Sequence, residues 1–291
     1  MSASVCSRRM LVLHAHPDDE SIMTGGVIAR YLAEGVDVRV VTFTLGEEGE
    51  VIGDEYAHLV ADQADQLGGY RIAELTRALA ALSPAGGPVL TPRFLGGAGR
   101  WRDSGMAGTP SARNPRCLLQ ADHDVLAATL AAEIVEFAPQ VVLTYDEAGT
   151  YGHPDHKRVH SVSRAALERA QAQTGARYKV YESVTEASAL RAGLDSVTMI
   201  PEGWRMPDDG ELPSYSDSRV TTEIDVSRYF EQKVSALAAH ATQITVAPSR
   251  REYALSNDVL QPVFGCEHFL RVDEDVRGSR RETDLFAGVA E

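Results

Sequence analysis

The amino-acid sequence predicts an α/β protein whose doubly wound, Rossmann-like sheet is mostly parallel and is followed by a C-terminal elaboration. Short apolar runs at residues 10–15, 38–44 and 141–145 have the composition of buried strands. Segments with helical spacing of apolar residues lie between them, and this order is typical of parallel sheets. The 291 residues, 44% of them apolar, suffice for one large α/β core or two modest ones.

In the first half of the chain, we expect a strand at residues 10–15, a helix at 21–32 and a strand at 38–44. Residues 55–82 have helical spacing that Gly68 and Gly69 interrupt, which predicts two helices or one broken helix. Residues 89–95 predict a third strand. Residues 96–115 are rich in Gly, Arg, Ser and Pro, and such a long irregular connection is often functional.

In the second half, we expect a helix at residues 122–137, a strand at 141–145, a helix at 156–173 and a strand at 178–184. The pattern loosens from 187 to 218, and a strand at 220–226 and a helix at 229–241 follow. We expect residues 1–186 to form the Rossmann-like metal-binding catalytic core. Residues 187–291 should form a substrate-shaping elaboration packed on it, within one compact domain overall.

Charge and cysteine content restrict the environment and the partners. The net charge of -14 argues against binding to nucleic acid or to an anionic membrane, because such surfaces need clustered Lys and Arg. Cys6, Cys117 and Cys266 are odd in number and widely spaced, so we predict neither a disulfide framework nor a thiolate zinc site. The apolar run before His14 is too short for a signal sequence or a membrane span. We therefore expect a cytoplasmic protein that acts on a small molecule, and we make no prediction of its oligomeric state.

Two motifs rich in histidine and aspartate each follow a predicted strand. They are HAHPDDE at residues 14–20 and YGHPDH at residues 151–156. The carboxyl ends of parallel strands line the same crevice, so the motifs should meet there. A catalytic zinc ion usually takes three ligands from His and carboxylate and leaves a position for water. We predict that His16, Asp19 and His156 hold one divalent ion, zinc or Fe(II), because non-haem Fe(II) oxygenases use a similar ligand set.

The remaining polar groups of the motifs favour hydrolysis over oxygen chemistry. Asp18 is not needed as a ligand and suits a general base that takes a proton from water. Tyr151 and His153 could stabilise an oxyanion, and we expect Asp155 to keep His153 protonated. These roles predict a metal-dependent hydrolase of an amide or ester.

Two further residues near the motifs have alternative interpretations. His160 follows His156 by four residues, the spacing at which two imidazoles on a helix can bind one zinc ion. We nevertheless expect His160 to be a solvent-exposed helix residue, because the first motif already supplies two ligands. Glu50 belongs to an acidic loop that follows the strand at 38–44, and we expect it at the rim of the pocket.

The pair of motifs resembles that of the PIG-L/LmbE-like family of zinc-dependent N-acetylglucosaminyl deacetylases. Segments 44–53, 65–72, 96–106 and 238–243 also resemble the mycothiol-pathway branch of this family, so the resemblance spans nearly the whole chain. It implies removal of the N-acetyl group from a GlcNAc-containing small molecule. The substrate that it implies is 1D-myo-inositol 2-acetamido-2-deoxy-α-D-glucopyranoside, in mycothiol biosynthesis.

The resemblance also implies roles for individual residues. By motif, His16, Asp19 and His156 match the zinc ligands, Asp18 the general base, and Tyr151 and His153 the oxyanion side. Arg71 and Asp103 match positions that hold hydroxyl groups of the sugar or the inositol. His240, in the segment 238–243, and Glu50 are further candidate substrate-binding residues.

Three other functions fit parts of this pattern. A mycothiol S-conjugate amidase belongs to the same branch, but its pattern has a lysine shortly after HPDDE, and residues 21–26 contain none. A deacetylase of another N-acyl sugar in a natural-product pathway also fits, because residues 187–218 resemble the family less. A non-catalytic sugar-binding protein on the same fold is an alternative of a different class.

Overall fold

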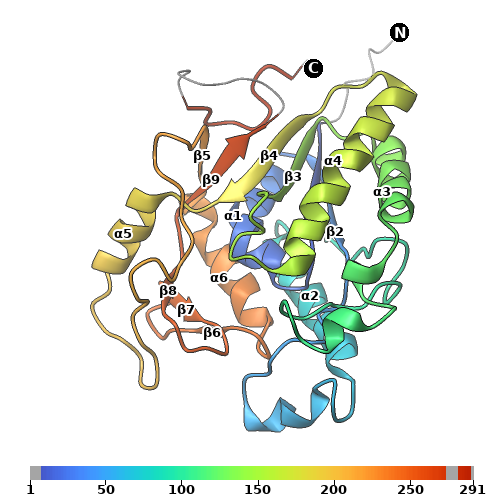
Figure 1. Ribbon diagram of the computed structural model, residues 1–291. Coiled ribbons are helices and arrows are strands. Elements are labelled where there is room, and N and C mark those ends of the chain that lie inside the picture. The colour runs from blue at the N-terminus through green and yellow to red at the C-terminus, as the bar shows by residue number, and fades with distance from the viewer. Residues whose placement is uncertain (1–7, 273–280, 290–291) are drawn as a thin grey trace.

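The computed structural model describes residues 8–272 and 281–289, and a six-stranded sheet runs through its centre (Figure 1). The strand order is β2-β1-β3-β4-β9-β5. Strands β2, β1, β3 and β4 are parallel, whereas β9 runs antiparallel to both β4 and β5. The predicted α/β class with a mostly parallel sheet is therefore confirmed. The strands of this sheet are β1 (Arg9–His14), β2 (Asp37–Thr42), β3 (Val141–Tyr145), β4 (Lys179–Val184), β5 (Thr222–Asp225) and β9 (Cys266–Arg271).

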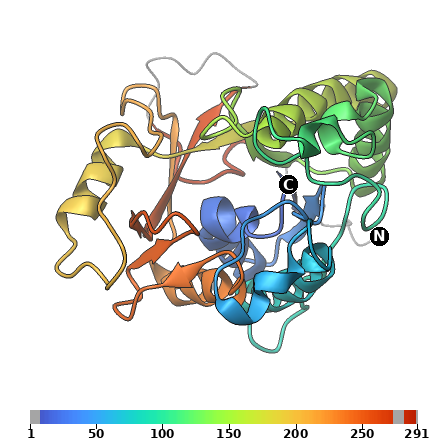
Figure 2. The ribbon, with the colours of Figure 1, turned by 60° about the horizontal axis from the view of Figure 1, so that its bottom comes forward.

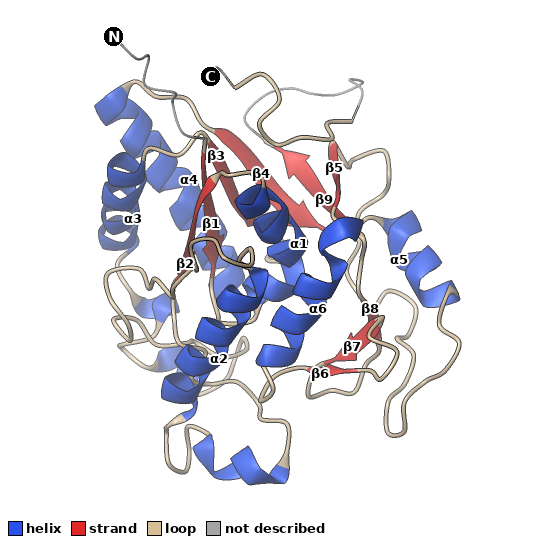
Figure 3. Ribbon diagram, turned by 180° about the vertical axis from the view of Figure 1, so that it is seen from behind, coloured by secondary structure: helices blue, strands red, loops and turns tan. Residues whose placement is uncertain are grey.

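Helices cover both faces of the sheet (Figure 3). One face carries α1 (Asp19–Ala33), α2 (Leu67–Leu82) and α6 (Phe230–Ala239), and the other carries α3 (His123–Phe137) and α4 (Pro154–Thr174). Helix α5 (Ala187–Asp195) lies to the side, near a small sheet of β6 (Thr245–Val246), β7 (Glu252–Ala254) and β8 (Gln261–Pro262) (Figure 2). Short 3-10 helices are η1 (Asp54–Leu59), η2 (Ser111–Arg113), η3 (Leu118–Gln120) and η4 (Ser227–Tyr229).

Strand β1 contributes to the core on both faces of the sheet. Met10 and Val12 pack on the side of α1 and α2, and Leu11 and Leu13 pack on the side of α3 and α4. All four side chains are fully buried. A strand covered on both faces needs apolar residues at every position, which explains the continuous apolar run in the sequence.

Most predicted elements of residues 10–184 are confirmed to within a few residues, but two predictions are wrong. Residues 89–95 form no strand and contribute only an isolated bridge between Thr42 and Phe94. Pro92 lies in the middle of this segment, and proline cannot donate a hydrogen bond to a sheet. Residues 55–82 do contain two helices, η1 and α2, but the break between them lies at residues 60–66 and not at Gly68 and Gly69, which are in the first turn of α2.

The C-terminal third contributes directly to the main sheet. β9 inserts between β4 and β5, with Glu182 opposite Leu270 in the β4–β9 pair. Helix α6 packs on α1 and α2 on the same face. The predicted boundary after residue 186 falls just after β4, and the sheet continues beyond it. Helix α5 and strands β6 to β9 had no counterpart among the predicted elements.

None of the helices in residues 8–272 and 281–289 is both long and apolar enough to cross a membrane. Cys117 and Cys266 are free thiols, buried and partly buried respectively. Cys6 lies outside the described residues.

Gly26 in α1 packs closely against Val226. A methyl group at this glycine would lie 2.5 Å from Cγ2 of Val226. We expect Gly26→Ala to lower the free energy of unfolding by about 1–3 kcal/mol, measured by chemical denaturation, because the neighbouring backbone must move. Gly69→Ala in α2 is the matched control, since its methyl group would meet nothing within 4 Å. Gly69→Ala should be neutral or stabilising, and equal losses in both variants would contradict this packing argument.

Candidate functional site

The pairing of β1 with β3 brings the two motifs together. These strands are parallel neighbours, with Met10 opposite Val141, so their carboxyl ends open at the same edge of the sheet. The imidazole rings of His16 and His156 lie 5.3 Å apart between centroids. The ring of His153 lies 4.6 Å from that of His16 and 5.0 Å from that of His156. All three side chains are buried.

Asp19 lies between the imidazoles of His16 and His156. Its Oδ2 is 3.4 Å from Nδ1 of His16, and its Oδ1 is 3.4 Å from Nε2 of His156. Zinc bonds of 2.0–2.1 Å in a tetrahedral site place neighbouring ligand atoms about 3.3 Å apart, so this spacing fits a shared ion. Within the described residues, both ring nitrogens of the buried His156 lack a hydrogen bond. The predicted ligand set therefore fits a divalent cation.

His153 is a further candidate ligand. One ligand nitrogen each of His16, His153 and His156 lies within 4.8 Å of the other two. The backbone N–H of Asp155 donates to Nδ1 of His153 at 3.2 Å, which leaves Nε2 of this ring for an ion or a substrate.

Two carboxylates flank the outer nitrogen of His16. Nε2 of His16 lies 3.4 Å from Oδ2 of Asp155 and 3.4 Å from Oδ1 of Asp103. Such a carboxylate on the far nitrogen is typical of metal-binding histidines, because it orients the ring. Burial acts to lower the pKa of His16, but the surrounding carboxylates outweigh it and hold the pKa well above its ordinary value. The cluster thus favours a positive charge at this point.

The prediction that Asp155 keeps His153 protonated is wrong. The carboxylate of Asp155 is directed at His16 and accepts the backbone N–H of Ser104 at 2.9 Å. His153 is the N-terminal cap of α4 through its Nδ1. Burial, together with the neighbouring His16 and His156, lowers the pKa of His153 to about 3. The imidazole is therefore neutral, with its proton on Nε2, where it can still act as a donor.

Asp18 is held beside the ligand cluster in an unusual backbone conformation. It precedes α1 with φ at 125°, a region that residues other than glycine rarely adopt. Its Oδ2 lies 3.0 Å from Nη2 of Arg71, and its backbone N–H donates to Oε2 of Glu20 at 3.0 Å. Burial raises the pKa of Asp18 to about 6, although Arg71 acts against this shift. A carboxylate with this pKa suits proton transfer near neutral pH.

Arg71 anchors Asp18. It is buried, and its Nη1 donates to the carbonyl of Gly46 at 2.8 Å while Nη2 donates to the carbonyl of Pro17. A Cβ atom at Gly46, where φ is 66°, would lie 2.1 Å from Nη1 of Arg71, so this position requires glycine. The predicted contact of Arg71 with substrate hydroxyls stays a prediction.

The other predicted substrate-binding residues, His240, Asp103 and Glu50, differ in how exposed they are and in their distance from the cluster. His240 has no exposed surface, and its Nε2 lies 2.8 Å from Oε1 of Glu20. Its predicted contact with substrate stays a prediction, and in this structure its observed partner is Glu20. Asp103 lies in the cluster beside His16, and its contact with substrate is untested. Glu50 is exposed and accepts a hydrogen bond from the hydroxyl of Ser256 at 2.7 Å, as a rim residue can.

Tyr145 and Tyr151 complete the surroundings of the cluster. The Tyr145 hydroxyl donates to Oδ2 of Asp19 at 2.6 Å, and its ring stacks on that of His156 with centroids 4.2 Å apart. Tyr145 is not among the residues predicted from the sequence, although a polar residue at the last position of a buried strand should face the crevice. Tyr151 is 53% exposed and lies edge-on to His156, so it is accessible to a substrate.

Tyr145 offers a direct test of the metal centre. We expect Tyr145→Phe to keep the stacked ring but to weaken zinc binding by about 10–100-fold, because Asp19 loses the hydrogen bond that orients it. Competition with a chromogenic chelator measures this affinity. Tyr178→Phe is the control, since Tyr178 is also buried and its hydroxyl makes no hydrogen bond within the described residues. Unchanged zinc affinity in Tyr145→Phe would contradict the orienting role.

Comparison with known proteins relates this site to a family. The family model of PIG-L, described as GlcNAc-PI de-N-acetylase, matches residues 11–167 and so includes both motifs. A protein of Gordonia bronchialis is 66% identical to this chain, over 96% of this chain and all of the relative. A protein of Rhodococcus opacus is 57% identical, over 97% of this chain and 98% of the relative. Both relatives are named 1D-myo-inositol 2-acetamido-2-deoxy-alpha-D-glucopyranoside deacetylase.

The fold also resembles a solved structure of low sequence identity. N,N'-diacetylchitobiose deacetylase from Pyrococcus horikoshii superposes with a TM-score of 0.52 and 16% identity, over 81% of this chain and 70% of that chain. At this identity the likeness supports the fold alone.

Proposed function

The chain belongs to the PIG-L family of GlcNAc-PI de-N-acetylases, and from this membership we propose that it deacetylates 1D-myo-inositol 2-acetamido-2-deoxy-α-D-glucopyranoside. The products are glucosaminyl-inositol and acetate, as in mycothiol biosynthesis. The observation that supports hydrolysis most directly is Asp18, a carboxylate outside the ligand set that Arg71 holds next to Asp19. The high identity to the relatives, over nearly the full chain, supports the choice of substrate.

His16, Asp19 and His156 would hold the divalent ion, for which we propose zinc, although the ligand types leave Fe(II) open. An ion bound there supplies a Lewis acid for the acetamide carbonyl and lowers the pKa of a water molecule. Asp18 accepts the proton of the attacking water, and its pKa of about 6 leaves it mostly ionised at neutral pH.

His153 and Tyr151 act on the opposite side of the reacting carbon. The neutral His153 donates Nε2–H to the oxygen that gains negative charge, and the Tyr151 hydroxyl is a second donor. When the carbon–nitrogen bond breaks, the proton held by Asp18 passes to the departing amine, which regenerates the carboxylate. Because His153 is neutral throughout, it serves as a hydrogen-bond donor and not as the acid.

The partners and location of the chain follow from the same proposal. The substrate is a neutral amino-sugar conjugate, and the net charge of -14 argues against nucleic acid and anionic membranes as partners. We propose that the enzyme acts in the cytoplasm.

Substitution of Asp18 tests the proton-transfer role. We expect Asp18→Asn to retain zinc and to lower kcat by at least about 100-fold, because an amide cannot accept the proton. Asp19→Asn is the contrasting variant, which should lose zinc itself. Acetate release measures turnover, and elemental analysis measures zinc. Retained activity in Asp18→Asn would rule out the base assignment.

A comparison of three substrates tests the proposed specificity. We expect the highest kcat/KM for GlcNAc-inositol, a lower value for free GlcNAc and the lowest for a mycothiol S-conjugate. The assay uses the zinc-loaded enzyme and measures release of the free amine. Preference for the conjugate would identify an amidase instead. Binding of GlcNAc-inositol without any turnover would favour the sugar-binding alternative.

A further inference from the structure

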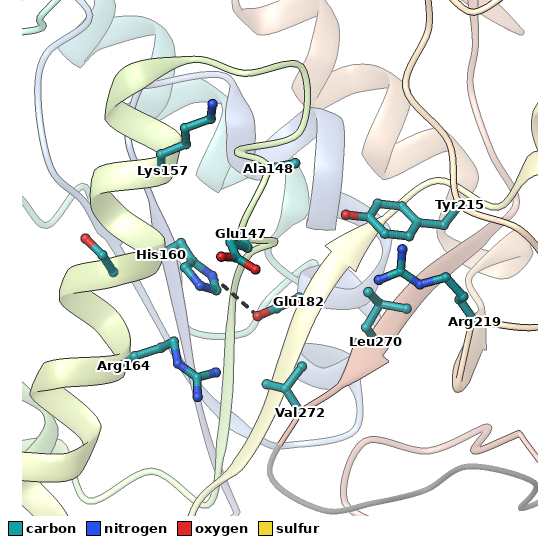
Figure 4. Close-up of a pocket in the computed structure, with 11 residues that line it drawn as sticks. Glu147, Ala148, Lys157, His160, Arg164, Glu182, Tyr215, Arg219, Leu270 and Val272 are labelled. Carbon is teal, nitrogen blue, oxygen red and sulfur yellow. Dashed lines mark ion pairs between the residues drawn. The ribbon is translucent and has the colours of Figure 1, made fainter.

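A cleft of about 1010 Å³ lies on the α4 side of the sheet, outside the site described above (Figure 4). Helix α4, strands β4 and β9, the loop after β3 and the segment 215–219 line it. None of the predicted catalytic, substrate-binding or metal-binding residues contributes to the lining. Helix α4 connects the two places, because His160 and Arg164 line the cleft four and eight residues after the metal-binding His156.

Three cationic side chains of the lining form no close ion pair, although Arg164 and Arg219 attract the carboxylate of Glu182. In residues 8–272 and 281–289, the side-chain nitrogens of Lys157, Arg164 and Arg219 form no ion pair and no hydrogen bond. Arg219 lies over the ring of Tyr215, 4.5 Å from its centroid. Arg164 and Arg219 reach toward the cleft from opposite sides (Figure 4). In a chain with a net charge of -14, three unpaired cations around one cleft create a local preference for an anion.

The acidic groups of the cleft reduce this preference only in part. Glu182 is buried, and its carboxylate lies 3.3 Å from Nδ1 of His160. Burial raises the pKa of Glu182 to about 7, so about half of these side chains are protonated at neutral pH and can donate a hydrogen bond to an anion. Glu147 is exposed at the rim. Asp146, whose carboxylate accepts the Tyr215 hydroxyl and acts on Glu182, adds a further negative charge. Three cations therefore face two full and one partial negative charge.

His160 belongs to this cleft and not to the bulk solvent. The sequence predicted an exposed helix residue, but His160 is 9% exposed, and its Nδ1 also lies 3.0 Å from the carbonyl oxygen of Tyr145. The exposed-residue prediction is wrong, because β4 and the end of β3 cover this face of α4. His160 therefore holds Glu182 at the base of the cleft.

We propose that the cleft is a second ligand site, which binds a small phosphorylated metabolite through Arg164 and Arg219. A guanidinium group matches phosphate with two parallel hydrogen bonds, and two such groups on opposite walls can hold one dianion. The volume is at the upper end of the range for small-molecule pockets. Leu270, Val272 and the Tyr215 ring provide apolar surface for the carbon body of such a ligand.

The cleft shares a loop with the catalytic site. Glu147 and Ala148 line it, and the same loop continues to Tyr151 and His153. The Tyr215 hydroxyl donates to Oδ2 of Asp146 at the start of this loop. A ligand in the cleft would therefore contact the segment that positions the oxyanion donors.

Phosphate binding to the metal-free protein tests the proposal. We titrate the chelator-treated chain with inorganic phosphate by calorimetry, because phosphate would otherwise also bind a metal ion in the catalytic site. The double variant Arg164→Gln/Arg219→Gln should bind at least about tenfold more weakly, since it loses the charge-assisted hydrogen bonds of both guanidinium groups. Arg169→Gln is the control for the charge of α4, because it removes one positive charge, as the Arg164 substitution does, at a residue that pairs with Asp124 outside the cleft.

Each outcome decides the proposal. Binding by the wild type and Arg169→Gln, with loss in the double variant, supports it, provided circular dichroism shows that all three proteins are folded. Absence of phosphate binding by the wild type, or equal binding by the double variant, overturns it. Acetate that binds as tightly as phosphate would overturn the phosphate assignment. Because no metal or substrate is present, these results do not depend on the proposed deacetylase activity.

Discussion

The parallel pairing of β1 with β3 is the interaction on which the arrangement of the site depends. The helices that follow these strands leave toward opposite faces of the sheet, α1 on one side and α4 on the other. The crevice between them is therefore open at the carboxyl ends of the strands. Both helices also begin there, at Asp19 and at Pro154, so the positive ends of two helix dipoles converge on the carboxylates of the cluster. Without this pairing, the two histidine motifs would not meet.

The cluster contains three buried carboxylates, and hydrogen bonds from the surrounding backbone stabilise their negative charge. Asp19 accepts the N–H of His16 at 3.0 Å, Asp155 that of Ser104 at 2.9 Å, and Asp103 that of Gly105 at 2.8 Å. Buried carboxylates need such partners, since an unpaired buried charge is strongly destabilising. The hydrogen bonds leave oxygen atoms facing the imidazoles, where a divalent cation would balance the remaining charge.

The C-terminal third holds the predicted catalytic residues in place through a series of buried hydrogen bonds. His240, at the end of α6, holds Glu20, which accepts the backbone N–H of Asp18. The segment that follows His240 is attached to α2. Thr242 donates hydrogen bonds of 2.8 Å to both carboxylate oxygens of Glu74, which is a residue of α2. Helix α2 also carries Arg71, the partner of Asp18. The region expected to shape the substrate pocket thus also holds the predicted general base in place.

The elements of the parallel half of the sheet, and the residues that meet at its carboxyl edge as a candidate metal site, can be predicted from the amino-acid sequence. Both are local signals: a strand buried on two faces is a continuous apolar run, and polar residues directly after it face the crevice. Which groups pair with one another depends on the packing of the folded chain. The carboxylate of Asp155 contacts His16 across 139 positions and not the imidazole of the nearby His153, and His240 contacts Glu20 across 220 positions. The insertion of β9 between β4 and β5 is equally non-local. Spacing along the chain encodes which face a side chain occupies, whereas its partner depends on how distant segments pack.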